Sequence, residues 1–138
     1  QAKQALEAKG VKVEVATVTS TNDVQQTMTS LAAKVDAIYL PTDNTVASTA
    51  STIGEILQEA KVPAMGSDAA VIDATLFTYG VDYHAIGVQA GELAVKILKG
   101  DKPADLPVEK PNTAAVTVNE EMATALGFDA ETIKALEK

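Results

Sequence analysis

Polar side chains that could bind a small molecule gather in three short segments, each directly after an apolar run. The segments are Thr42-Asp43-Asn44, Gly66-Ser67-Asp68 and Gly80-Val81-Asp82, and Tyr83 follows the third. A carboxylate accepts hydrogen bonds from ammonium or hydroxyl groups, an asparagine amide both donates and accepts, and glycines let backbone N–H groups approach closely. If the segments meet in space, they can hold and discriminate a polar solute. The candidate ligand-binding residues are Thr42, Asp43, Asn44, Ser67, Asp68, Asp82 and Tyr83.

These residues also have a purely structural interpretation. Asp and Asn are favoured at helix N-caps, so Asp43, Asn44 and Asp68 could each simply begin the next helix. Taken one at a time, capping is the better interpretation of each residue. Their recurrence at three equivalent places along the chain favours a binding site.

Catalytic and metal-binding chemistry has little support. The sequence contains no Walker loop, dinucleotide fingerprint or nucleophile elbow, no cysteine, and a single histidine, His84, which we interpret as a surface or interlobe residue. A receiver-type phosphoacceptor site needs a lysine after its fifth strand, where residues 77–80 provide none. An α/β enzyme acting through Asp43 and Asp68 would lack a base, a nucleophile and a metal. We therefore expect a binding protein with no catalytic residue, no metal and no cofactor.

The composition indicates one folded domain that does not bind nucleic acid. The chain has 138 residues, of which 46% are hydrophobic and 22% are charged, enough for a core of its own. Its net charge is −8 and it has no run of Lys or Arg, which argues against nucleic acid and against adsorption to anionic lipid. No apolar stretch reaches the ~20 residues that span a bilayer. The chain begins without Met inside a helical pattern, so we expect it to be part of a longer protein.

Strands and helices alternate along the sequence. Hydrophobic periodicity and turn residues predict strands at 11–15, 35–40, 62–65, 76–79 and 114–118. They predict helices at 1–9, from the N-cap Asn22 to about 34, at 46–60, from Tyr83 to Gly100, and from Glu120 and Asp129.

This alternation predicts an α/β fold, a three-layer sandwich with a mainly parallel sheet and helices on both faces, because parallel neighbours need a crossover. Ligands of such sheets bind beyond the carboxyl ends of the strands. The loops at 19–22, 42–44, 66–68 and 80–83 are therefore expected to meet at that edge.

Four stretches, taken in order, resemble the ABC transporter substrate-binding lipoproteins of the tryptophan/tyrosine type. They are residues 39–46, 66–68, 77–83 and 91–100, and the resemblance extends over essentially the whole chain. It implies that residues 1–138 form one ligand-binding lobe of a type I periplasmic-binding fold whose N-terminal lobe is absent here. It further implies capture of a small molecule, an aromatic or other hydrophobic amino acid, and delivery to the permease subunits of an importer.

The resemblance also assigns roles to residues. Asn44 is similar to the strand-end asparagine that contacts ligands in this fold, with Thr42 and Asp43 supporting it. Asp68 is similar to the acid of a Gly-x-Asp loop, and Asp82 or Tyr83 to a polar residue near the hinge. The family is extracytoplasmic, so the parent protein is expected at the cell surface on a lipid anchor whose signal is not in this chain.

Residues 83–107 resemble a hinge-crossing helix segment that normally packs on the other lobe. The apolar stripe of that helix, Ile86, Ala90, Leu93 and Ile97, would then be exposed here, and exposed patches of this kind drive association. We therefore expect a homodimer or a strand-swapped assembly of the isolated lobe.

The same architecture also serves as the effector domain of transcriptional repressors. The sequence before Gln1 would discriminate between the two functions. A signal peptide with a lipobox indicates transport, and a helix-turn-helix indicates regulation.

Overall fold

A four-stranded sheet forms the centre of the fold in the computed structural model, which describes residues 1–111 and 114–137. The strands are β1 (Ile38–Leu40), β2 (Ala64–Gly66), β3 (Phe77–Val81) and β4 (Ala114–Val118), in the order β1-β2-β3-β4. β1, β2 and β3 are parallel, and β4 is antiparallel to β3. The predicted α/β fold with a mainly parallel sheet is therefore confirmed.

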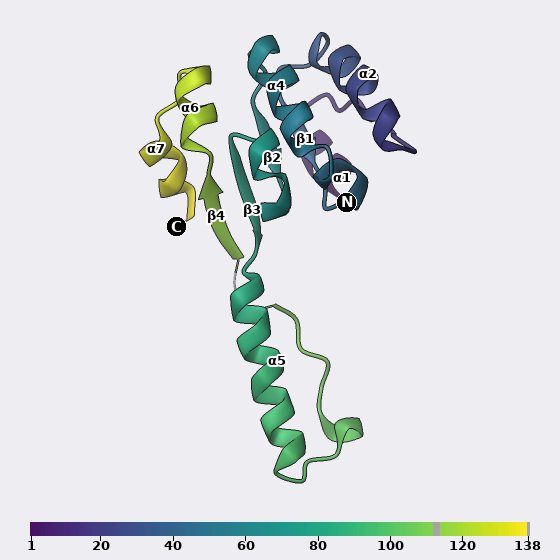
Figure 1. Ribbon diagram of the computed structural model, residues 1–138, viewed down its shortest axis with the longest axis vertical. Helices are drawn as coiled ribbons and strands as arrows, with labels where there is room; N and C mark the ends of the chain where they lie inside the picture. Colours follow the sequence, from purple (N-terminus) through teal and green to yellow (C-terminus); the bar gives the residue numbers. More distant parts are fainter. Residues whose placement is uncertain (112–113, 138) are drawn as a thin grey trace.

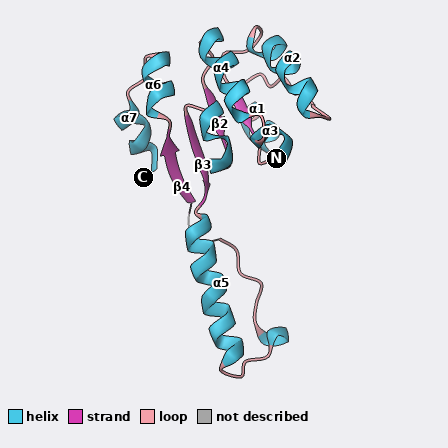
Figure 2. Ribbon diagram, in the orientation of Figure 1, coloured by secondary structure: helices cyan, strands magenta, loops and turns pink. Residues whose placement is uncertain are grey.

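Helices cover both faces of this sheet (Figures 1 and 2). The α-helices are α1 (Ala2–Glu7), α2 (Thr21–Ala32), α3 (Asn44–Ala47), α4 (Ala50–Ala60), α5 (Tyr83–Leu98), α6 (Glu120–Leu126) and α7 (Ala130–Lys134). Three short 3-10 helices are η1 (Ala69–Ala74), η2 (Pro103–Asp105) and η3 (Ala135–Glu137). Helices α2 and α4 pack with η1 on one side of the sheet, and α6 and α7 lie against β4 on the other.

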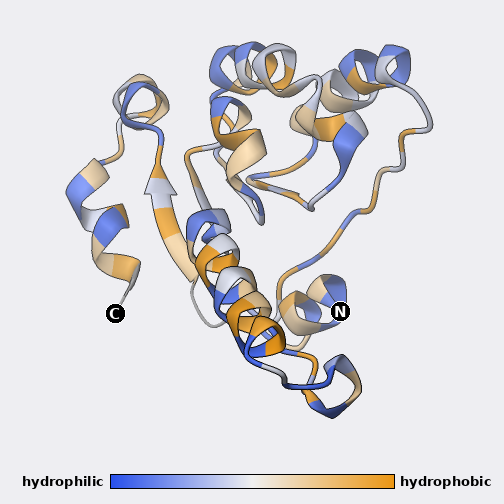
Figure 3. Cartoon of the chain, turned by 60° about the horizontal axis from the view of Figure 1, so that its bottom comes forward, coloured by the Kyte–Doolittle hydropathy of each residue, from blue (hydrophilic) through white to orange (hydrophobic). Residues whose placement is uncertain are grey.

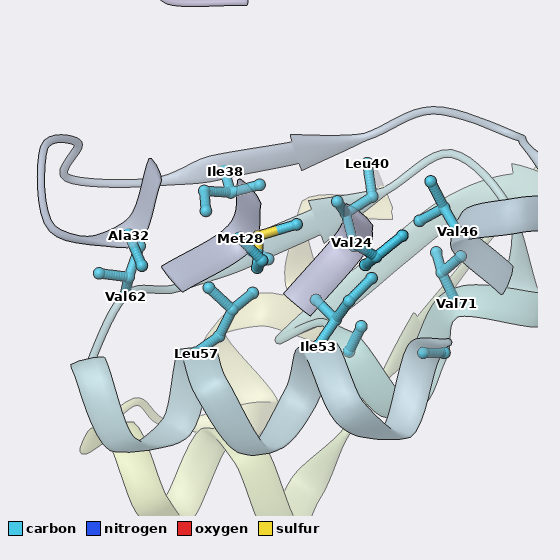
Figure 4. Close-up of a cluster of buried hydrophobic side chains, with 13 residues drawn as sticks. Val24, Met28, Ala32, Ile38, Leu40, Val46, Ile53, Leu57, Val62 and Val71 are labelled. Atoms are coloured by element: carbon cyan, nitrogen blue, oxygen red, sulfur yellow. The ribbon is translucent and has the colours of Figure 1, made fainter. Parts of the chain in front are cut away.

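The larger hydrophobic core lies between β1 and β2 and the helices α2 and α4 (Figure 4). Ile53 and Leu57 are four residues apart, so they share one face of α4, and both are fully buried. Val24 and Met28 have the same spacing on α2 and meet them. This core fixes the two helices and the first two strands as one unit.

A second, smaller core lies on the opposite face of the sheet. It contains Leu76, Ala123 and Ile133, with Phe77 and Val118 packed against it. Phe77 is adjacent to the buried Thr78, and successive strand residues face opposite sides, which separates the two cores. This core joins α6 and α7 to β3 and β4.

The predicted strand at 11–15 is wrong. Val11 is 47% exposed and Val15 is 65% exposed, and the segment belongs to no strand. The alternating pattern is typical of a half-buried strand, but a strand also needs a hydrogen-bonded neighbour. Within residues 1–111 and 114–137, no strand pairs with this segment.

Several predicted boundaries also differ. The N-cap of α2 is Ser20 rather than Asn22, and the predicted helix at 46–60 is two helices, α3 and α4, separated at Ser48 and Thr49. Gly80 and Val81 belong to β3 instead of a loop, because they pair with β4. β1 begins at Ile38 instead of residue 35, since β2 offers it only three partners.

The long helix predicted from Tyr83 is confirmed, and it projects away from the sheet (Figure 1). None of its 16 residues is buried, and apolar residues occur along its length (Figure 3). The returning chain is held to it by Gln89, whose Nε2 donates to Glu109 Oε2 at 2.7 Å, and by the Lys96–Glu109 ion pair at 3.7 Å. Among the helices of the described residues, none has the length and apolarity needed to cross a membrane.

Gly80 lets the end of β3 approach the loop after β2. A Cβ atom at residue 80 would lie 2.8 Å from the carbonyl oxygen of Ser67 and 3.3 Å from the Cα of Asp68. Because backbone atoms would be the ones displaced, only glycine fits here without moving that loop.

We predict that Leu57→Ala lowers the free energy of unfolding by about 2–5 kcal/mol, because it removes a fully buried side chain from the larger core. Urea unfolding followed by circular dichroism measures this change. Leu136→Ala is the matched control: Leu136 is 64% exposed, and its loss is expected to change stability by less than ~0.5 kcal/mol. Equal effects of the two substitutions would contradict the placement of the core.

We also predict that Gly80→Ala destabilises the fold by about 1–3 kcal/mol through overpacking against Ser67. Gly91→Ala is the control, since a Cβ at residue 91 has no neighbour within 4 Å and alanine favours a helix by about 1 kcal/mol. Opposite shifts of the thermal midpoint are expected for the two variants. A neutral Gly80→Ala would show that the strand and the loop are not in close contact.

Candidate functional site

The parallel register places two of the three polar segments next to each other. Leu40 pairs with Gly66, so the carboxyl ends of β1 and β2 coincide, and the loops that follow them lie side by side. The Ser67 N–H donates to the Leu40 carbonyl at 3.1 Å. The hydroxyls of Thr42 and Ser67 are 3.1 Å apart and hydrogen-bonded. The structure therefore brings Thr42 and Ser67 together, as predicted for this edge of the sheet.

The third segment joins the same edge through Tyr83. Its hydroxyl donates to Asp68 Oδ2 at 2.7 Å, while Asp68 Oδ1 accepts from the Ala70 N–H at 2.9 Å. Asp68 is only 6% exposed, whereas Tyr83 is 59% exposed. The hydrogen bond to the Asp68 carboxylate and its negative charge raise the pKa of the Tyr83 phenol. The aspartate is thus buried beside a tyrosine that faces solvent.

Asp43 and Asp82 act as helix caps. Asp43 Oδ1 accepts from the N–H groups of Thr45 and Val46 at 2.8 and 3.0 Å, and Asp82 Oδ1 accepts from those of His84 and Ala85 at 2.8 and 3.1 Å. The structural interpretation, helix capping, therefore holds for both residues, and Asp68 also caps η1 through one of its two carboxylate oxygens. Such caps also fix the direction of the loop that precedes each helix.

Asn44 is the predicted residue with the greatest freedom to bind. It is the first residue of α3, it is exposed, and its side-chain amide makes no hydrogen bond to any described residue. The expectation that it caps a helix does not hold, because Asp43 occupies the N-cap. Its amide can donate to and accept from a ligand beside Thr42.

The loop at 19–22 is organised around an acid that the sequence did not single out. The hydroxyls of Ser20 and Thr19 each donate to Asp23 Oδ2 at 2.9 Å, and these bonds lower the pKa of the Asp23 carboxyl. The loop lies beside a shallow hollow of about 210 Å³ between α2 and α4, lined by Thr21, Asn22, Val24, Gln25, Thr49 and Thr52.

The sequence did not predict Thr49 and Thr52 as candidates, because threonines in a helical pattern carry no signal that separates them from ordinary surface residues.

A larger hollow of about 490 Å³ is lined by α2 side chains alone: Asn22, Gln25, Gln26, Thr29 and Ser30. It borders none of the three polar segments and is therefore separate from the candidate site.

The site offers binding groups rather than reactive ones. In the described part of the chain, no group of three or more His, Cys, Asp or Glu residues could hold a metal ion. The hydroxyls of Thr42 and Ser67 bond to each other, and Ser67 also donates to the Leu40 carbonyl, so neither contacts a general base. What this edge can do is exchange hydrogen bonds with a small polar molecule.

Comparison with known proteins identifies the family. Residues 1–134 match the family model described as ABC transporter substrate binding protein. A tyrosine-binding protein of Clostridioides difficile is 33% identical over 110 residues, which is 79% of this chain and 32% of that protein. The chain therefore spans about a third of the length of this relative.

Solved structures agree with this assignment. An ABC domain from Streptococcus pneumoniae in complex with L-Trp is 37% identical, with a TM-score of 0.80 over 98% of this chain and 46% of that one. A substrate-binding protein with adhesive properties from Clostridium difficile, in its ligand-free, open form, is 35% identical, with a TM-score of 0.77 over 93% and 44% of the two chains. A conserved domain protein from Vibrio cholerae is 31% identical, with a TM-score of 0.81 over 96% and 46%.

The matched family consists of binding proteins rather than enzymes, and no repressor is among these relatives. The sequence resemblance is therefore confirmed: this chain belongs to the family of ABC transporter substrate-binding proteins.

Proposed function

We propose that this chain is one lobe of a solute-binding protein that captures an aromatic or other hydrophobic amino acid for an ABC importer. The observation that carries the proposal is the presence of exposed polar groups on Thr42, Asn44 and Tyr83 at the carboxyl-end edge of the sheet, with the half-buried Ser67 between them. The ligand class is supported by a relative named for tyrosine and by a structural neighbour that holds L-Trp.

Binding in this mechanism involves no covalent step. A ligand that contacts two lobes shifts the equilibrium between open and closed forms by its differential affinity for them. This chain contributes one wall of the cleft, and the aromatic side chains that select a ring can come from the other wall. One lobe alone makes only part of the contacts, so it should bind weakly.

The seven candidate residues divide into two roles within this proposal. Thr42, Asn44, Ser67 and Tyr83 present polar groups to the ligand. The carboxylates of Asp43, Asp68 and Asp82 fix the three loops by accepting backbone N–H bonds, and Asp68 also holds Tyr83.

The proposal extends to the rest of the protein. The projecting segment 83–107 would cross a hinge and pack on a second, N-terminal lobe, since α5 has no buried residue here. The whole protein would be extracytoplasmic, held at the cell surface by a lipid anchor, and would deliver its ligand to permease subunits.

We predict that a thermal-shift screen of the natural full-length protein finds stabilisation by L-tryptophan, L-tyrosine or another hydrophobic amino acid. A ligand present at 100 times its dissociation constant adds about 2.7 kcal/mol to the free energy of unfolding. A screen of amino acids with no change of the midpoint would contradict the proposed ligand class.

A pair of variants links this shift to the site. Asn44→Ala should reduce the ligand-induced shift without changing the midpoint of the free protein, because Asn44 has no partner within the described chain. Gln58→Ala removes another exposed amide, in the last turn of α4, which leads to the start of β2 and not to its carboxyl end, and should leave the shift intact.

In the stripe predicted for α5, Ala90 and Ile97 are exposed, whereas Ile86 and Leu93 are half-buried. We predict that the isolated chain self-associates through α5, because Val88, Val95 and Leu98 on this helix are also 51%, 47% and 86% exposed. Light scattering should give a mass above that of one chain at high concentration. Leu98→Glu should return the mass toward one chain, and a monomeric unsubstituted chain would contradict this association.

A further inference from the structure

The hydrogen bond between Asp68 and Tyr83 determines whether the tyrosine hydroxyl can donate a hydrogen bond to a ligand or only accept one. A phenol has one proton and can donate it to one acceptor only. In this structure the Tyr83 proton points at Asp68 Oδ2 across 2.7 Å, a length typical of a strong bond to a charged oxygen. The lone pairs of the phenol oxygen remain, so toward a ligand Tyr83 is an acceptor.

The surroundings keep the proton in this arrangement. Asp68 is 6% exposed, and its other oxygen accepts from the Ala70 N–H. The carboxylate is therefore held in one orientation, and water cannot easily replace the phenol as its second donor. Releasing the Tyr83 proton would leave a buried carboxylate oxygen without a donor, which is costly. The bond also increases the electron density on the phenol oxygen and so makes it a better acceptor.

The local charge favours the same kind of ligand group. Segments 42–44, 66–68 and 80–84 contain three aspartates and neither lysine nor arginine. An ammonium group is attracted to such an edge, and a carboxylate is repelled from it.

We propose that Tyr83 is the specificity-determining residue for the ammonium group of the amino-acid ligand, and that the buried Asp68 is a positioning residue that holds Tyr83 as an acceptor. This inference rests on the proposed function and makes it more specific. The ligand ammonium donates to the Tyr83 oxygen. Asp68 itself is buried; it orients the Tyr83 hydroxyl and adds negative charge near the ligand ammonium.

The test compares each amino acid with its analogue that lacks only the amino group. Calorimetric titration of the natural full-length protein with L-tryptophan and indole-3-propionate, and with L-tyrosine and 3-(4-hydroxyphenyl)propionate, gives the preference for the ammonium group. Tyr83→Phe should lower this preference at least tenfold, mainly by weakening amino-acid binding. Tyr79→Phe, which removes a hydroxyl from another exposed tyrosine, should leave it unchanged.

The positioning role of Asp68 has its own readout. Asp68→Asn should also lower the preference at least tenfold, because an amide can donate to the phenol oxygen and free its proton. In ¹³C NMR of ring-labelled tyrosine, the pKa of Tyr83 should then return toward its ordinary value. Asp129→Asn makes the same change of charge at the distant N-cap of α7 and should alter neither quantity.

Four results would overturn the proposal. A preference that survives Tyr83→Phe would show that another group selects the ammonium, and an equal loss of affinity for the amino acid and its analogue would show a structural role only. A Tyr83 titration that is unchanged in Asp68→Asn would contradict the positioning role while leaving the proposed function intact. A wild-type protein that binds none of the amino acids would contradict the proposed function and the selection together.

Discussion

The parallel alignment of the short strands β1 and β2 is the constraint on which the rest of the site depends. Three residue pairs bring Leu40 level with Gly66, and this alone makes the loops after them neighbours. The alignment is maintained by the core beneath it, where Ile38 and Leu40 face α2 and α4. A slip of one residue would turn these side chains toward the other face of the sheet, which couples the polar edge to the apolar packing.

Much of this could be predicted from the sequence because it depends on local patterns. The spacing of Ile53 and Leu57 defines the buried face of α4, and Asp43 and Asp82 cap helices for the reason that aspartates usually do. The meeting of the loops at 42–44 and 66–68 followed from a general property of parallel sheets. Fold class and the position of the candidate site were therefore accessible without coordinates.

Other features depend on contacts between distant residues, and the sequence could not supply them. Residues 11–15 alternate like a strand, but whether they form one depends on a neighbouring strand that their own pattern does not specify. The bond between Tyr83 and Asp68 joins residues 15 positions apart through a side-chain orientation that no periodicity reveals. The close approach of Gly80 to Ser67 likewise becomes visible only when both backbones are placed.

The attachment of α5 has a mechanical consequence. Val81 precedes the projecting segment and Ala114 follows it, and these two residues are paired neighbours on β3 and β4, so the segment departs from one point of the sheet. A helix of 16 residues is about 24 Å long, and a rotation of about 10° at this pivot would move its far tip by about 4 Å. Tyr83 lies in the first turn of α5, close to this point, so such a rotation would displace the far end of the helix much more than the tyrosine.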